Sequence, residues 1–222
     1  MSEKNGLNPF LNSRRNAGIL AIFALVTTLA IALTFTLTKA TIAEQKQIKL
    51  LAVIFDVVNR DLITNDIQDN CLVLPEDAAL GNKTGLKAYR GYNDAGQLTS
   101  IALQSVAPNG YSGDIRFLVG LASDFSTITG VRVLEHQETP GLGDKIDLRI
   151  SDWILDFTNT NATIDNAKAW TVTKEGGQFD AFTGATITPR ALVQAIHKTA
   201  IFAQDNADFL RTADNVCAEE TI

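Results

Sequence analysis

The sequence has few residues of the kinds that bind metals or form disulfides: two histidines and two cysteines among 222 residues. So few, widely separated ligands do not make a recognisable zinc, haem or iron–sulfur site. No G-x-G-x-x-G follows an expected strand, so a dinucleotide-binding fold is not supported. Internal repeats and low-complexity linkers are absent too. The composition, 45% hydrophobic and 20% charged, fits one ordinary globular domain plus a membrane anchor.

Residues 16–38 contain no charged side chain and consist mostly of Ala, Ile, Leu, Val and Phe. A helix of about 20 such residues spans a hydrocarbon core of about 30 Å. We therefore predict one transmembrane helix at residues 16–38. The alternative is a cleaved signal peptide, for which Thr41 and Ala43 provide a weak cleavage pattern, but its apolar region is usually only about 7–15 residues long.

The charges that flank this segment predict its orientation. Lys4, Arg14 and Arg15 precede it, while Lys39 follows it closely. An excess of positive charge on the short N-terminal side places residues 1–15 in the cytoplasm and exports the rest. Four basic residues and one acidic residue precede position 40, which leaves the exported part with 15 basic and 24 acidic residues, a net charge of −9. Phosphate backbones repel such a domain, so nucleic acid is not an expected partner.

Both cysteines, Cys71 and Cys217, lie in the exported part. An oxidising compartment permits a disulfide between them, which would stabilise the fold by about 2–5 kcal/mol. Two unpaired, inert thiols are an equally acceptable interpretation. Neither the spacing nor the neighbours of the two residues indicate a metal site or a redox pair.

Beyond the apolar segment we expect a connector at residues 39–85 and a main domain at residues 86–222. Apolar residues of the connector recur at helical spacing, so an amphipathic helix that continues from the membrane is expected over residues 42–66. The residues of this predicted apolar face are Ile48, Leu51, Ala52, Phe55 and Val58.

Alternating apolar residues and turn chemistry predict four strands in the main domain. Turns are expected at residues 93–96 and at Asn109-Gly110, and a short helix near residues 151–157. A long helix follows with Thr188 as its N-cap and Pro189 at its first position. The fold class is therefore α+β, with a transmembrane helix before a single mixed, mostly antiparallel sheet that helices flank. The predicted strands are residues 86–92, 98–106, 115–122 and 128–134.

Residues 180–188, with the sequence D-A-F-T-G-A-T-I-T, form a loop of small and hydroxyl residues that leads directly into the long helix. The unpaired N–H groups and the positive end of the helix dipole favour an anion at this place. Gly184 permits a turn or the close approach of a ligand. On these grounds alone, a helix cap without any ligand is the favoured explanation of the loop.

Residues 180–186 resemble the D-x-x-[S/T]-G-A-T signature of proteins that carry FMN through a phosphoester bond to the last threonine. Residues 110–115, G-Y-S-G-D-I, resemble the G-Y-x-G-x-I stretch of the same family. Residues 136–143, H-Q-E-T-P-G-L-G, resemble its H-x-E-T-P-G-L-G loop. The three motifs occur in the family's order, and the resemblance extends over nearly the whole chain.

The family includes the G subunit of the Rnf (Rsx) complex and the C subunit of the sodium-translocating NADH:quinone reductase. The compact length and the T-G-A-T variant look more like the former. The resemblance implies an inner-membrane complex that couples electron transfer between NADH and ferredoxin to ion movement. In it, this chain would be a non-autonomous electron-transfer subunit with a periplasmic domain, relaying electrons between cofactors of membrane, iron–sulfur and flavin subunits.

The resemblance also implies that a flavin transferase moves FMN from FAD onto Thr186. Gly141 and Gly143 would clear space for the isoalloxazine ring, while Glu138 and Thr139 would bind its polar edges. No catalytic or metal-binding residue is implied. The full set of expected FMN-binding residues is Thr186, Thr183, Gly184, Ala185, Asp180, Tyr111, Glu138, Thr139, Pro140, Gly141, Leu142 and Gly143.

Several residues outside this set have simpler interpretations. Lys174 and Arg190 flank the site and would either screen the flavin phosphate or lie on solvated surface. His136 is expected to be structural, and Trp153 and Trp170 to lie in the core.

Two other functions remain open at this point. A non-redox exported sensor or anchor would use T-G-A-T only as a helix cap. A self-sufficient flavin reductase would need a catalytic set that the sequence does not contain.

Overall fold

The computed structural model describes residues 9–214 and residue 216, with side chains from residue 14 onward apart from that of residue 46. The chain divides into two units, Met1–Lys49 and Leu50–Ile222. The first contains most of the long helix α1 (Pro9–Val57), and the second contains the sheet and the remaining helices.

Within the first unit, α1 is helical throughout and is long and apolar enough to cross a membrane. Its apolar side chains are exposed over successive turns, with 70% of Leu25 and 70% of Leu29 accessible. The hydroxyls of Thr27, Thr34 and Thr38 each donate to the carbonyl four residues earlier, at 2.8–2.9 Å. These polar groups of the apolar segment are therefore satisfied inside the helix, as a hydrocarbon environment requires. The chain is a membrane-anchored protein.

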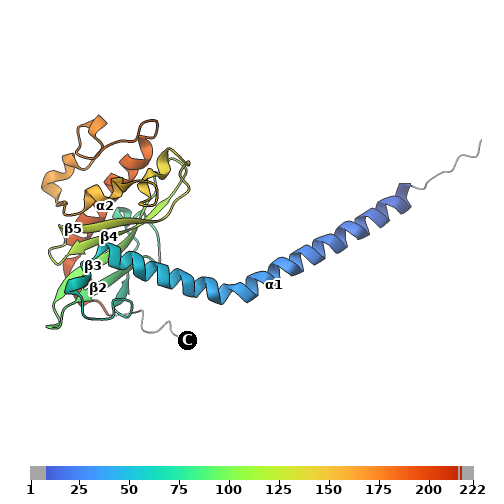
Figure 1. The fold of residues 1–222 in the computed structure, drawn as a ribbon, viewed down its shortest axis with the longest axis horizontal. Helices are drawn as coiled ribbons and strands as arrows, with labels where there is room; N and C mark the ends of the chain where they lie inside the picture. Colours follow the sequence, from blue (N-terminus) through green and yellow to red (C-terminus); the bar gives the residue numbers. More distant parts are fainter. Residues whose placement is uncertain (1–8, 215, 217–222) are drawn as a thin grey trace, which may run out of the picture. The chain divides into compact units, whose positions relative to one another are not determined.

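The second unit is built on a five-stranded sheet in the order β1-β2-β3-β4-β5, and every neighbouring pair is antiparallel (Figure 1). The α+β prediction is confirmed, and the four predicted strands agree with β2–β5 to within one residue at each end. The strands are β1 (Cys71–Val73), β2 (Lys87–Tyr92), β3 (Leu98–Ala107), β4 (Ile115–Ala122) and β5 (Ile128–Glu135).

Helix α2 (Ile187–Asp205) packs against β3 and β4, and the short α3 (Ala207–Thr212) follows it. Successive side chains of β3 point to opposite faces of the sheet, as a strand requires. Ile101 and Leu103 lie in the core beneath α2, whereas Ala102 lies in a second core on the other face. Short 3-10 helices complete the unit: η1 (Arg60–Leu62), η2 (Ala78–Leu80), η3 (Gly143–Ile146), η4 (Asp152–Phe157), η5 (Ile164–Ala169) and η6 (Thr173–Glu175).

The last two turns of α1 belong to the second unit and cover the other face of the sheet. Gly120 and Gly130 are paired across β4 and β5 at this place. A Cβ atom on Gly120 would lie 1.9 Å from the carbonyl oxygen of Val57, so the glycine makes room for the helix end. The hydroxyl of Thr129 donates a short hydrogen bond to the same oxygen. These contacts fix the end of α1 to the sheet.

Two details of the predicted connector are wrong. The helix expected over residues 42–66 does continue from the apolar segment as the end of α1, but it stops at Val57. Its buried side chains are Ile54 and Val57, joined by Val58 just beyond its end, whereas Ile48 of the predicted face is 54% exposed. The segment also contributes strand β1, which alternation did not reveal because it is only three residues long.

Cys71 is buried at the start of β1. Its carbonyl accepts a 3.0 Å hydrogen bond from the backbone N–H of Val216. Cys217 lies outside the described residues, so its bond to Cys71 stays a prediction.

Candidate functional site

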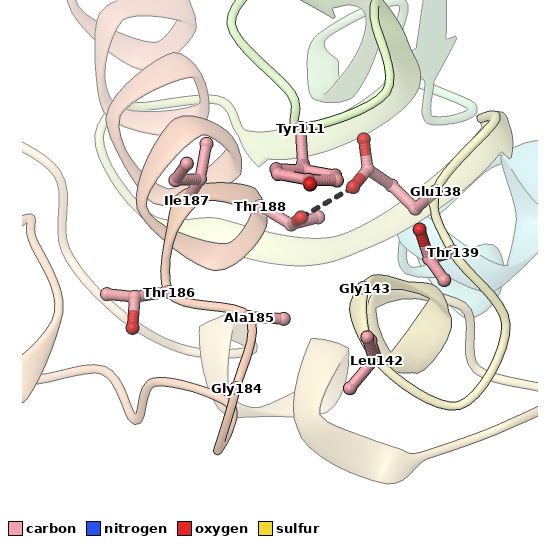
Figure 2. Close-up of a pocket in the computed structure, with 10 residues that line it drawn as sticks. All are labelled: Tyr111, Glu138, Thr139, Leu142, Gly143, Gly184, Ala185, Thr186, Ile187 and Thr188. Atoms are coloured by element: carbon pink, nitrogen blue, oxygen red, sulfur yellow. Dashed lines mark hydrogen bonds between the residues drawn. The ribbon is translucent and has the colours of Figure 1, made fainter.

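Three segments that are far apart in the sequence line one pocket of the second unit (Figure 2). They are the turn between β3 and β4, the loop after β5, and the loop that leads into α2. The cavity is about 290 Å³ in volume, close to the smallest sites that bind small molecules, which start at about 300 Å³. Its lining residues are Tyr111, Glu138, Thr139, Leu142, Gly143, Gly184, Ala185, Thr186, Ile187 and Thr188.

The loop into α2 is held by a buried aromatic residue and a tight turn. Phe182 is 6% exposed and packs edge-on against Trp153, with ring centroids 5.0 Å apart. The N–H of Ala185 donates to the carbonyl of Phe182 at 3.1 Å, which closes the turn. Gly184 has a φ of +83° at the third position of this turn, a conformation that favours glycine. The turn therefore delivers Thr186 to the helix start in a fixed place.

Thr186 is the N-cap residue of α2, but its hydroxyl makes no capping hydrogen bond. The side chain is partly buried, and its Oγ1 accepts a 3.2 Å hydrogen bond from Nζ of Lys174. The prediction that Thr188 caps the helix is wrong, because α2 begins at Ile187. Thr188 is fully buried within the first turn, and its hydroxyl binds elsewhere.

Glu138 joins the three segments. Its carboxylate is 5% exposed; one oxygen accepts a 2.5 Å bond from the Thr188 hydroxyl and the other a 3.1 Å bond from the N–H of Ser112. Figure 2 shows the Thr188 bond in the upper part of the pocket, with Thr186 and Gly184 in the lower part. A buried carboxylate is costly unless such donors satisfy it. Because an ionised carboxylate has about four acceptor positions, Glu138 keeps capacity for a donor on a ligand.

Two glycines of the motifs leave room for this carboxylate. A Cβ atom on Gly110 would lie 2.7 Å from Oε1 of Glu138, and one on Gly143 would lie 2.7 Å from Oε2. Gly143 therefore makes room for Glu138 and Thr188, while the expectation that it also clears space for a flavin ring stays a prediction. Gly141 has a φ of +77°, and no atom lies within 4 Å of its hypothetical Cβ. Glycine is therefore favoured at this position by the backbone conformation and not by a lack of space.

His136 is structural, as expected. Its Nδ1 accepts a 3.1 Å hydrogen bond from the N–H of Glu138, and its Nε2 lies 3.8 Å from the carboxylate of Asp147. The Arg149 side chain donates to Asp147 and lowers the pKa of that carboxyl below its usual value. This chain of contacts fixes the loop at Glu138.

The structure brings most of the predicted site residues together. Eight of the twelve line the pocket, while Asp180, Thr183, Pro140 and Gly141 lie beside it in the same loops. Trp153 and Trp170 are buried, as predicted. Ile187 and Thr188 also line the pocket but were not predicted to do so, because Thr188 was expected to be the N-cap of the helix.

Known proteins resemble this chain over most of its length. A model of the FMN-binding domain matches residues 110–200, and a model of the RnfG N-terminal region matches residues 2–57. The G subunit of the ion-translocating oxidoreductase complex of Pseudoalteromonas atlantica is 47% identical over 206 residues, which cover 93% of this chain and 95% of that protein. The G subunit from Vibrio cholerae is 47% identical over 204 residues, 92% and 96% of the two chains. Among solved structures, NqrC of Shewanella oneidensis is 25% identical with a TM-score of 0.48, over 69% of this chain and 74% of that one.

Proposed function

This chain belongs to the family of G subunits of ion-translocating oxidoreductase complexes, and we propose that it relays electrons through an FMN esterified to Thr186. It is a flavoprotein electron-transfer subunit of an Rnf complex. The observation that carries the covalent assignment is the position of Thr186. Thr186 is the N-cap residue of α2, its hydroxyl makes no capping hydrogen bond, and it lies on the wall of a pocket that residues from all three motifs line.

The pocket residues fit an FMN group. Leu142, Ile187 and Tyr111 offer exposed apolar surface for the flat ring system, and each is 43–69% accessible. Glu138 and Thr139 offer acceptors for the polar ring edge. The N-terminus of the 19-residue helix α2 favours the phosphate. FMN supplies the electron transfer when bound, and the protein positions it and adjusts its potential.

The membrane orientation is part of the same proposal. Positive charge before residue 16 favours a cytoplasmic N-terminus, a span at residues 16–38 in the bacterial inner membrane and an FMN-binding domain at residues 86–222 in the periplasm. A covalent bond matters there because FMN lost from the protein would not be readily replaced. The same compartment permits the disulfide between Cys71 and Cys217.

The chain acts in redox catalysis as a non-autonomous subunit. Electrons enter and leave through cofactors of the other membrane, iron–sulfur and flavin subunits. The complex as a whole couples electron transfer between NADH and ferredoxin to ion movement. A flavin transferase loads Thr186 during maturation. The C subunit of the sodium-translocating NADH:quinone reductase is not favoured as an identity, because the 47% identical relatives are G subunits.

A pair of threonine variants in the assembled complex tests the proposal. Thr186→Val should abolish flavin absorbance in the denatured, washed chain, whereas Thr84→Val, at an exposed position outside the pocket, should retain it. Flavin that stays bound after denaturation of the Thr186→Val chain would contradict the assignment. A C-terminal reporter active only in the periplasm tests the orientation separately.

A further inference from the structure

The turn η6 (Thr173–Glu175) reaches the proposed site of flavin attachment through a hydrogen bond from Lys174 to Thr186. Nζ of Lys174 lies 3.2 Å from Oγ1 of Thr186, although twelve residues separate them in the sequence. We propose that Lys174 binds the phosphodiester by which FMN is attached to Thr186. This inference rests on the proposed function, since it requires an ester at that oxygen.

The backbone beneath Lys174 is held in place. The N–H of Thr173 donates to the carbonyl of Phe179 at 2.8 Å, and Phe179 packs 4.9 Å from the ring of Trp170 in the core. A Cβ atom on Gly177 would lie 1.9 Å from the carbonyl oxygen of Thr171, so only glycine allows the turn to close this tightly. Lys174 thus projects from a rigid turn, and its contact with Thr186 does not depend on a free loop.

The charges around η6 leave the ammonium group of Lys174 available. Its neighbour Glu175 forms an ion pair with Arg190 and accepts a 2.9 Å hydrogen bond from the hydroxyl of Thr171. Within the part of the chain that the structure describes, no carboxylate forms an ion pair with Lys174. The Glu175–Arg190 pair also ties η6 to the first turns of α2, which places Lys174 beside the helix start.

A phosphodiester on Thr186 is the anion that this arrangement fits. It would carry one negative charge on the non-bridging oxygens of its phosphorus, two bonds beyond the oxygen that Lys174 already contacts. An ammonium–phosphate hydrogen bond is charge-assisted and roughly twice as strong as a neutral one. The positive end of α2 would act on the same group. Lys174 supplies the side-chain charge that the backbone N–H groups lack.

The transfer of FMN from FAD to Thr186 involves no oxidation or reduction. Oγ1 of Thr186 forms a bond to the phosphorus of the FMN half of FAD, and the bond from that phosphorus to the AMP half breaks. AMP leaves with the bridging oxygen, and the hydroxyl proton passes to a base of the transferase or to water. Nζ of Lys174 lies next to the charge of the product.

Amine labelling of the full-length chain tests the contact directly. The chain is prepared with and without flavin transferase and FAD, treated briefly with an amine-acetylating reagent, and digested for mass spectrometry. Lys198 is the internal control, because it is exposed on α2, about 18 Å along the helix from Thr186. Labelling of Lys174 should slow severalfold after Thr186 is loaded, while labelling of Lys198 should not change. Equal labelling of Lys174 before and after loading would overturn the proposal.

Variants give a second readout, the initial rate of FMN incorporation measured from the intact mass. Lys174→Arg should incorporate FMN at close to the parental rate, Lys174→Ala severalfold more slowly, and Lys174→Glu more slowly still. Lys198→Ala should match the parent. Parental rates in Lys174→Glu would overturn the proposal. Failure of the unaltered chain to gain FMN on Thr186 would instead reject the proposed function, so the two failures are distinct.

Discussion

The hydroxyl of Thr188 donates a 2.5 Å hydrogen bond to the carboxylate of Glu138 and so joins the first turn of α2 to the loop after β5. Both residues are buried. In the residues that the structure describes, no cation pairs with Glu138, so hydrogen bonds alone compensate its burial. The geometry of the pocket therefore depends on this pair.

The first prediction concerns this hydrogen bond. Thr188→Val keeps the shape of the side chain but leaves a buried carboxylate oxygen without its donor, so the free energy of unfolding should fall by about 1–3 kcal/mol. Denaturant unfolding of the full chain in detergent, followed by circular dichroism, measures this. Thr183→Val, at an exposed position, should change it by less than about 0.5 kcal/mol. Equal effects of the two substitutions would show that the bond contributes nothing.

Glu138→Gln should raise the reduction potential of the bound flavin. The substitution removes a buried negative charge from the pocket wall and thereby stabilises the reduced, more negative flavin, by an amount on the order of tens of millivolts. Spectroelectrochemical titration of the loaded chain measures the shift. Asp165→Asn, which changes an exposed acid outside the pocket, is the control. A lower or unchanged potential would contradict a position of Glu138 near the ring.

Gly120→Ala should weaken the attachment of the end of α1 to the sheet. The new methyl group would meet the Val57 carbonyl at 1.9 Å, and overpacking of this kind costs about 1–3 kcal/mol. Gly96→Ala is the matched control, since its Cβ would meet nothing and only its φ of +72° is strained. Thermal unfolding should show a larger loss for Gly120→Ala. If Gly96→Ala is the more damaging change, the glycine pair is not a docking feature.

The stability of the domain should depend on pH through Asp147. Because Arg149 lowers the folded-state pKa of this carboxyl, its contribution is present above its unfolded pKa of about 3.9 and is lost as the pH falls toward the folded value. Asp147→Asn and Arg149→Ala should each flatten the decline in unfolding midpoint between about pH 5 and pH 2. Identical pH profiles for the parent and both variants would exclude this assignment.

Strands β2–β5 could be predicted from the sequence because apolar and polar residues alternate along them with a period of two, and because Asn and Gly mark the turns. It did not allow the buried face of the end of α1 to be predicted. Between residues 50 and 58 nearly every position is apolar, so several helical stripes fit the same residues. Ile54, Val57 and Val58 are selected by packing in the second core on the sheet, where Gly120 and Gly130 leave room for the backbone of Val57.

The site residues were predictable as motifs, but their contacts were not. Thr188 reads as a helix cap, and only the folded chain brings it to Glu138, fifty residues away. Gly143 reads as space for a ligand, yet the space is filled by Glu138 and Thr188. The approach of Lys174 to Thr186 likewise depends on the closure of η6 against the core.

The central claim is that FMN is esterified to Thr186, and fragment-ion mass spectrometry of the chain from the native complex tests it most directly. A peptide that contains residues 175–190 should carry the mass of FMN less one water. Its fragment ions should place that mass on Thr186, with Thr183 and Thr188 unmodified. An unmodified peptide, or a flavin mass located on Thr183 or Thr188, would contradict the account.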